Sequence, residues 1–304
     1  MTDSVRRRAR TAEEFGEITA RLFVPEEIMA SIAGFRPRPS DVIISPFGKC
    51  GTTWLQQIFH SLRTRGDMDF EDISAVVPWI ETAALLGIDL DAEQRAEPRG
   101  FKSHLPSHMA PGGARYIVSL RDPGDALVSM YRFMEGWFIE PGAVSIAAFA
   151  ERWLSGEDDG SDYWTHLLGW WERRDDPELL LIAYEQMIDA PAKHVRLVAE
   201  FCDIPLDAEL LALTLERSSL DFMLARKEKF SDPMMRRASE ARCGLPPGSD
   251  SAKVRKGGVG GHERELPPEV GERLDAIWAE RIAPVLGFAD YAALARELGR
   301  RHAS

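Results

Sequence analysis

The sequence predicts an α/β fold: a single domain with a central parallel sheet, helices on both faces and a P-loop-like turn after the first strand. Short β-branched runs alternate along the chain with longer amphipathic segments, which is the pattern of strands joined by crossover helices. A chain of 304 residues, 44% of them apolar, can bury one large core. No internal repeat or linker divides it, so we treat residues 1–304 as one domain.

The elements follow in chain order. The first strand, 41–45 (DVIIS), is short and β-branched, and the helix after it, 53–63, places Trp54, Ile58 and Leu62 on one face. The further strands expected are 100–104, 115–120 and 179–183, each followed by a turn or a helical pattern. The further helices expected are 126–135, 146–154, 163–173, 192–201, 208–215 and 270–282.

Two segments depart from this alternation. Residues 1–40 precede the first strand and are expected to form an N-terminal extension. Residues 229–262 are polar and punctuated by Gly and Pro, and they are too long for a passive connection in a compact domain. This segment is predicted to be a lid or a binding loop.

Composition excludes several classes of protein. A net charge of −12 argues against a nucleic-acid-binding surface, so any polyanionic ligand needs a local cluster of Lys and Arg. No apolar run approaches the length of a membrane span, and nothing marks secretion. The three cysteines are widely separated, and neither they nor the histidines show metal-ligand spacing. We therefore expect a cytoplasmic protein without a structural metal.

The turn after the first strand, within SPFGKCGTTWLQQI (45–58), suits an anion. The first N–H groups of a helix lack intrahelical partners, and the helix dipole adds partial positive charge there. Gly48 and Gly51 allow close approach, and Lys49 adds a full charge. The lysine precedes the second glycine, unlike the Walker A order. Taken alone, the string is equally compatible with a glycine turn that carries a solvated lysine.

The other strand ends carry further candidates, because ligands of open α/β sheets bind outside the carboxyl ends of the strands. Lys102 and His104 follow the second strand, Arg121 the third and Tyr184 the fourth. His104 suits proton transfer near neutral pH. On the residues alone, structural roles are more common than functional ones. His104 could be hydrogen-bonded to the backbone, and Arg121 could pair with Asp122 or Asp125.

Four ordered motifs resemble the cytosolic-type sulfotransferases that use 3′-phosphoadenosine 5′-phosphosulfate (PAPS). GKCGTTW at 48–54 is similar to the family's PKSGTTW, and FKSHLP at 101–106 to its KTHLP element. RDPGDALVSMYRF at 121–133 is similar to RNPKDVAVSYYHF, and KVRKGGVGG at 253–261 to RKGxxGDW. THLLGWWERRDDPELLLIAYEQM at 165–187 is also close to the family's sequence. The match runs through nearly the whole chain in the right order.

The resemblance implies a sulfuryl transfer from PAPS to a hydroxyl, with PAP (adenosine 3′,5′-bisphosphate) as product and no metal. It implies His104 as general base, with Lys49 and Lys102 as the other catalytic residues. The cofactor residues it implies are Lys49, Cys50, Gly51, Thr52, Thr53 and Trp54 in the first loop, Arg121, Ser129, Arg255, Lys256 and Gly257 around the 3′-phosphate, and Tyr184 and Ser218 beside the base. The acceptor would be a hydrophobic small molecule or lipid-like alcohol or phenol contacting Trp79, Met134 and Phe138.

The chain departs from the family at several positions. Cys50 replaces a serine and places a thiol at a helix start, where we expect a lowered pKa and easy oxidation. Leu220 stands where the family has a second adenine-stacking Phe, and Gly261 and His262 replace Asp-Trp. The family's dimer motif is not retained, so the oligomeric state is left open.

Two other functions remain compatible with these residues. A P-loop kinase of a small molecule would require Mg²⁺. A non-catalytic nucleotide-binding protein would keep the fold without transfer, and Cys50 is the departure that favours it. Both lysines and His104 favour the enzyme.

Overall fold

The computed structural model describes residues 6–155, 162–248 and 260–302. Its centre is a parallel sheet of four strands in the order β2-β1-β3-β4. The strands are β1 (Val42–Ile44), β2 (Gly100–Lys102), β3 (Arg115–Leu120) and β4 (Leu179–Ala183). All four predicted strands are confirmed, the last two with the predicted bounds.

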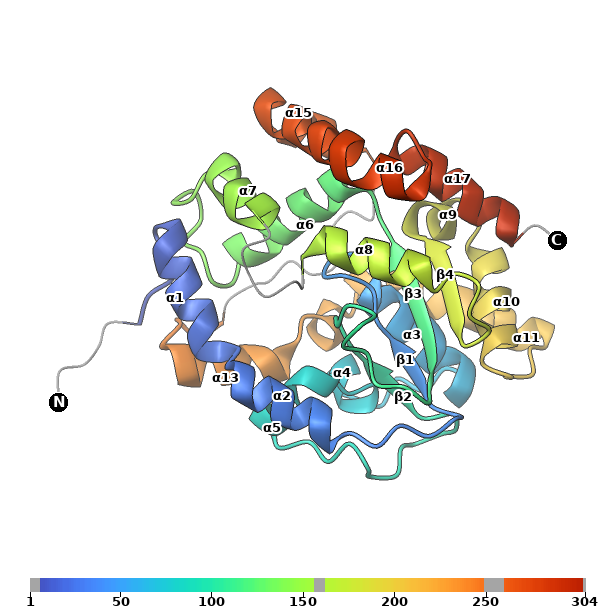
Figure 1. Ribbon diagram of the computed structural model, residues 1–304. Coiled ribbons are helices and arrows are strands. Elements are labelled where there is room, and N and C mark those ends of the chain that lie inside the picture. Colours follow the sequence, from blue (N-terminus) through green and yellow to red (C-terminus); the bar gives the residue numbers. More distant parts are fainter. Residues whose placement is uncertain (1–5, 156–161, 249–259, 303–304) are drawn as a thin grey trace.

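Successive strand residues face two separate hydrophobic clusters, as the alternation of side chains in a strand requires. Ile43, Val118 and Leu181 point to the cluster that contains Trp164 and Trp170 of helix α8 (Tyr163–Glu172). The other face carries Val42, Ile44, Ile117, Leu180 and Ile182, packed with residues of α3 (Thr52–Thr64), α10 (Pro191–Phe201) and α11 (Ala208–Arg217). The sheet is thus covered on both faces, as the sequence predicts (Figure 1).

The other predicted helices are also present: α6 (Pro123–Glu135), α7 (Ile146–Ser155) and α15 (Pro268–Ile277). The predicted helix 270–282 continues past α15 as a π-helical turn, Trp278–Ile282. The helices that the sequence analysis did not anticipate are mostly short: α4 (Ile73–Val76), α5 (Ala83–Leu86), α9 (Tyr184–Asp189), α12 (Leu220–Leu224), α14 (His262–Glu265), α16 (Ala283–Leu286) and α17 (Tyr291–Arg301), with 3₁₀ turns at Ile80–Thr82 and Lys227–Phe230.

The N-terminal segment belongs to the core. It forms α1 (Ala12–Leu22) and α2 (Pro25–Gly34), and α1 buries Phe15, Ile18 and Leu22 in the larger hydrophobic cluster. In Figure 1 the two helices run along one side of the molecule next to α13 (Pro233–Cys243). Arg242 of α13 donates to both carboxylate oxygens of Glu27, at 2.6 and 2.7 Å.

Helix α13 corrects the expectation of a loop over residues 229–262. Pro occupies its first turn, where no N–H is needed, and Met235 and Cys243 are buried on one side of it. The low hydrophobicity of PMMRRASEARC hides this face from a reading of composition alone. Residues 249–259 of the expected loop lie outside the described residues.

A buried ion pair holds the start of β1 to the residue before β2. Arg99 donates to Asp41 through Nε (3.0 Å) and Nη2 (2.7 Å), and both side chains are almost fully buried. Asp41 also accepts from the backbone N–H of Arg38 at 2.8 Å. Because each charge has lost its hydration, each depends on the other.

We therefore expect Asp41→Asn to lower the free energy of unfolding by about 3–5 kcal/mol, since it leaves the Arg99 charge buried without its partner. The matched control is Arg65→Ala, which removes a pair with Asp207 in which both side chains are more than half exposed. That change should have little effect. Urea unfolding of both variants measures the difference, and equal effects would contradict this assignment.

Candidate active site

A cavity of about 940 Å³ lies at the carboxyl ends of the strands. Strand order makes this the place for a ligand, because the chain leaves β1 toward β2 on one side and later returns to β3 on the other. The cavity lining includes most residues predicted from the sequence: Lys49, Gly51, Thr52, Thr53, Trp54, Trp79, Lys102, His104, Arg121, Ser129, Met134, Phe138, Tyr184 and Ser218. Arg255, Lys256 and Gly257 lie outside the described residues.

The turn after β1 presents a helix start to this cavity. Lys49 and Gly51 both have left-handed backbone conformations, with φ of 69° and 102°. A side chain on Gly51 would meet the Tyr184 ring at 2.9 Å, so glycine is required for space as well as conformation. Helix α3 starts without a side-chain cap or an acidic residue in its first turn. The buried Thr52 hydroxyl has no hydrogen-bond partner among the described residues. Backbone and hydroxyl together fit an anion.

Two lysines reach the cavity over aromatic rings. Lys49 Nζ lies 4.3 Å from the centre of the Phe133 ring, and Lys102 Nζ lies 3.9 Å from that of Trp79. The Trp79 segment pairs with the edge of β2, where the Lys102 N–H donates to the Pro78 carbonyl at 2.7 Å. The ring faces attract the ammonium groups electrostatically and fix their positions.

His104 is oriented by two contacts. Its Nδ1 lies 2.7 Å from the Pro46 carbonyl oxygen, which can only accept a hydrogen bond, so Nδ1 carries the proton. In the neutral ring the basic lone pair is therefore on Nε2. The Trp79 ring packs against the imidazole with centres 5.1 Å apart and planes at 83°. This tautomer is the one that a general base needs.

Glu81 supports this arrangement, and the sequence analysis did not single it out. Its carboxylate accepts the backbone N–H of His104 at 2.6 Å, and the side chain is buried. Burial raises the pKa of Glu81, and the nearby Lys102 charge acts in the opposite direction. In the sequence, the one feature that could have identified Glu81 is its position two residues after the predicted site residue Trp79, in VVPWIE.

Arg121 joins the end of β3 to the turn after β1. Its Nη1 donates to the Lys49 carbonyl at 2.8 Å, and its guanidinium lies 4.4 Å from the centre of the Tyr184 ring. Tyr184 meets Trp54 edge to face at 5.8 Å. Two aromatic side chains beside a cation can accommodate a purine ring and an anion. Ser218 also lines this end, although its hydroxyl donates to Thr214 O at 2.7 Å.

The opposite part of the cavity is apolar. Phe23, Met134, Trp137 and Phe138 contribute to its lining together with Trp79. The indole N–H of Trp137 donates to Ser239 of α13 at 2.8 Å, so its polar atom is satisfied away from the ligand space. Such a wall favours a hydrophobic ligand.

Cys50 is the predicted site residue that the structure corrects. Its side chain is fully buried in the larger hydrophobic cluster and is absent from the cavity lining. Its N–H donates to Phe47 O at 3.0 Å, and its carbonyl accepts from the Ser119 hydroxyl. Burial raises the pKa of the thiol to about 12. The expectation of a lowered pKa was wrong because the side chain turns away from the helix start into the core.

The chain is similar in sequence to known sulfotransferases. The model of the sulfotransferase domain matches residues 39–285. Sulfotransferase 1C2 of Rattus norvegicus is 26% identical over 264 residues, covering 83% of this chain and 86% of the relative. Sulfotransferase 1B1 of Mus musculus is 27% identical, with the same two coverages.

Solved structures share the fold. A mouse sulfotransferase complexed with PAP superposes with a TM-score of 0.66 at 21% identity, covering 91% of this chain and 95% of that one. Retinol dehydratase in a complex with retinol and PAP has a TM-score of 0.66 at 17% identity, covering 90% and 96%.

We expect Cys50 to resist alkylation in the native protein. With a pKa of about 12 the thiolate fraction at pH 8 is roughly 1,000-fold below that of an ordinary exposed thiol, and burial also blocks access. Iodoacetamide labelling followed by mass spectrometry of native and urea-unfolded protein measures the rate. Rapid labelling of native Cys50 would contradict the buried placement.

Proposed function

Because the chain belongs to the sulfotransferase family, we propose that it transfers a sulfuryl group from PAPS to the hydroxyl of a hydrophobic small molecule or lipid-like acceptor, with His104 as general base. The observation that carries this proposal is the convergence of His104, Lys49 and Lys102 on one cavity with the start of α3. No helix among the described residues is long and apolar enough to cross a membrane. We propose that the enzyme acts in the cytoplasm.

The two ends of the cavity suggest how the substrates lie. The nucleotide would place its 5′-phosphosulfate on the turn from Lys49 to Thr53. Its adenine would stack on Trp54 beside Tyr184, and its 3′-phosphate would point toward Arg121 and Ser129. PAP in two structural neighbours supports a nucleotide of this kind. The acceptor would occupy the apolar wall, with Trp79, Met134 and Phe138.

The chemical step assigns a role to each charged residue. The acceptor oxygen attacks sulfur while its proton passes to Nε2 of His104, and the Pro46 carbonyl stabilises the resulting imidazolium through Nδ1–H. The bond from sulfur to the bridging 5′-phosphate oxygen breaks, and negative charge develops on that oxygen. Lys49 and the N–H groups of α3 stabilise this charge, while Lys102 neutralises the sulfuryl oxygens.

The kinase alternative would need a different charge arrangement. Phosphoryl transfer relies on a metal ion held at the phosphates. A sulfuryl group carries one negative charge, and two lysines with a helix start suffice to hold it. The family match supports sulfuryl transfer over both alternatives considered from the sequence.

We expect His104→Ala to bind PAP like the wild type but to lose turnover by roughly 100-fold or more, because the imidazole contacts the acceptor hydroxyl and not the nucleotide anions. Lys49→Ala should lose nucleotide affinity and turnover together, since its charge contacts both ground state and leaving group. Calorimetric titration of PAP beside sulfate transfer from PAPS separates the two effects.

The matched control is His108→Ala, which removes a histidine outside the cavity lining. It should behave as wild type in both measurements. Full turnover in His104→Ala would overturn the assignment of the base.

A further inference from the structure

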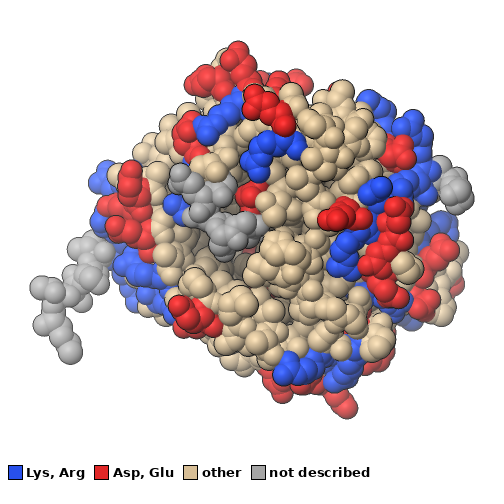
Figure 2. All heavy atoms as spheres, in the orientation of Figure 1, with Lys and Arg blue, Asp and Glu red and all other residues tan. Residues whose placement is uncertain are grey.

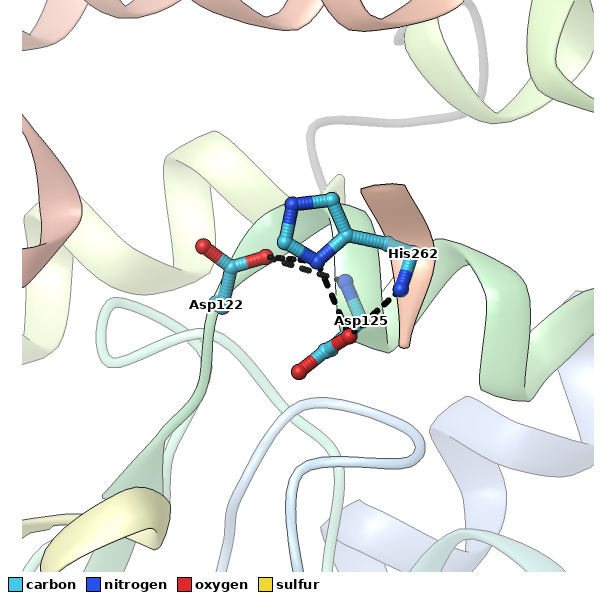
Figure 3. A group of neighbouring side chains, drawn as sticks. All are labelled: Asp122, Asp125 and His262. Atoms are coloured by element: carbon cyan, nitrogen blue, oxygen red, sulfur yellow. Dashed lines mark hydrogen bonds and ion pairs between the residues drawn. The ribbon is translucent and has the colours of Figure 1, made fainter. Parts of the chain in front are cut away.

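Two carboxylates and one imidazole meet at the start of α6 (Figure 3). His262 Nδ1 lies 2.9 Å from Asp125 Oδ1 and 3.3 Å from Asp122 Oδ1. Asp125 also accepts the backbone N–H groups of His262 at 3.1 Å and Gly260 at 2.8 Å. The segment 260–262 is therefore fastened to α6 through a single carboxylate.

The imidazole rests on a glycine. A Cβ on Gly124 would lie 2.7 Å from Cδ2 of His262, so any side chain there would push the ring away. Gly124 has no need of a left-handed conformation, since it lies in the first turn of α6 after Pro123. Its requirement for glycine comes from His262.

Local charge differs from that of the family motif. The family's RNPKD stands against RDPGD at 121–125, so this chain has an aspartate, Asp122, in place of a neutral asparagine and a glycine, Gly124, in place of a lysine. The first turn of α6 is thereby more negative by two charges. His262, which with Gly261 replaces the family's Asp-Trp pair and stands at the position of the Trp, fills the space above Gly124.

This charge matters for the cavity. Asp125 lines it together with Arg121, Ser129 and Arg264. An anion bound by Arg121 and Ser129 would face a carboxylate with a second one beside it, and repulsion from them would weaken binding unless cations offset it. Arg121 and Arg264 line the cavity, and His262 is the cation-forming group in direct contact with both carboxylates.

We propose that His262 supplies this cation in place of the missing lysine, and that it thereby determines the affinity of this enzyme for the 3′-phosphate of its nucleotide. It acts through Asp125 and Asp122 and is a positioning residue for phosphate binding. The inference rests on the proposed function, because it assumes a 3′-phosphorylated nucleotide in this cavity.

The surrounding charges favour the protonated ring. The hydrogen bond to Asp125 raises the pKa of His262, burial opposes this, and Asp122, Asp125 and Glu263 add to the rise. Glu185 faces the same turn and accepts the Asp122 N–H at 3.0 Å, and the cations Arg121 and Arg264 line the same cavity. Because the pKa lies above its ordinary value, the charge is present at low pH and is lost as pH rises through the shifted pKa.

The test compares PAP with adenosine 5′-phosphate, which lacks the 3′-phosphate, by calorimetric titration. We expect His262→Gln to lose about tenfold in PAP affinity at pH 6, equivalent to roughly 1.4 kcal/mol, with unchanged affinity for adenosine 5′-phosphate. The wild-type advantage should disappear toward pH 9, and using the variant as reference removes the titration of the phosphate itself. Gly124→Lys added to His262→Gln should restore PAP affinity and make it independent of pH in this range.

Gly124→Ala is a second variant that displaces the ring while retaining every ionisable group, and it should reproduce the selective loss. Equal losses for both nucleotides, no loss for PAP, a wild-type advantage that persists at pH 9, or failure of the added lysine to rescue would each overturn the proposal. Wild-type protein that binds PAP no better than adenosine 5′-phosphate would instead contradict the proposed function.

Discussion

The site depends on gathering cations in a chain whose net charge is −12. Lys49, Lys102 and Arg121 line one cavity beside the start of a helix, where like charges repel. The rings of Phe133, Trp79 and Tyr184 lie against the three cations, and the Lys49 carbonyl accepts an N–H of Arg121. These ring and carbonyl contacts stabilise the cations without adding negative charge of their own, and the carboxylates of Asp125 and Glu81 lie nearby. The described residues on the face in Figure 2 show no comparable concentration: side chains of both signs are interspersed among mostly uncharged ones.

Sheet topology brings these residues together. The chain leaves β1 toward β2 on one side and β3 lies on the other, so the turn after β1 opens between their carboxyl ends. The hydrogen bond from Arg121 to the Lys49 carbonyl joins the end of β3 to this turn, in which Lys49 has a left-handed backbone. Behind it, Glu81 fixes the backbone of His104 from the neighbouring segment. Catalytic groups from separate strand ends are thus held by contacts that cross between them.

Much of this architecture could be predicted from local sequence patterns. The four strands are short runs, fully β-branched in β1, and the motifs at their ends contain Lys49, His104 and Arg121 of the cavity lining. Contacts between distant segments could not be predicted. Cys50 points into the core because the turn rotates it there, Glu81 matters through a backbone N–H 23 residues away, and α13 hides an apolar side within a polar sequence. The sequence gives no partner for His262, because its contact with Gly124 forms only in the folded chain.

The most direct test of the account is transfer of labelled sulfate from PAPS to a panel of hydrophobic alcohols and phenols, in the presence of EDTA. Because lysines and a helix start hold the sulfuryl group, we expect labelled sulfate ester to form with at least one acceptor and at an undiminished rate when metal is chelated. No transfer from PAPS to any acceptor, together with Mg²⁺-dependent phosphate transfer from ATP, would contradict it.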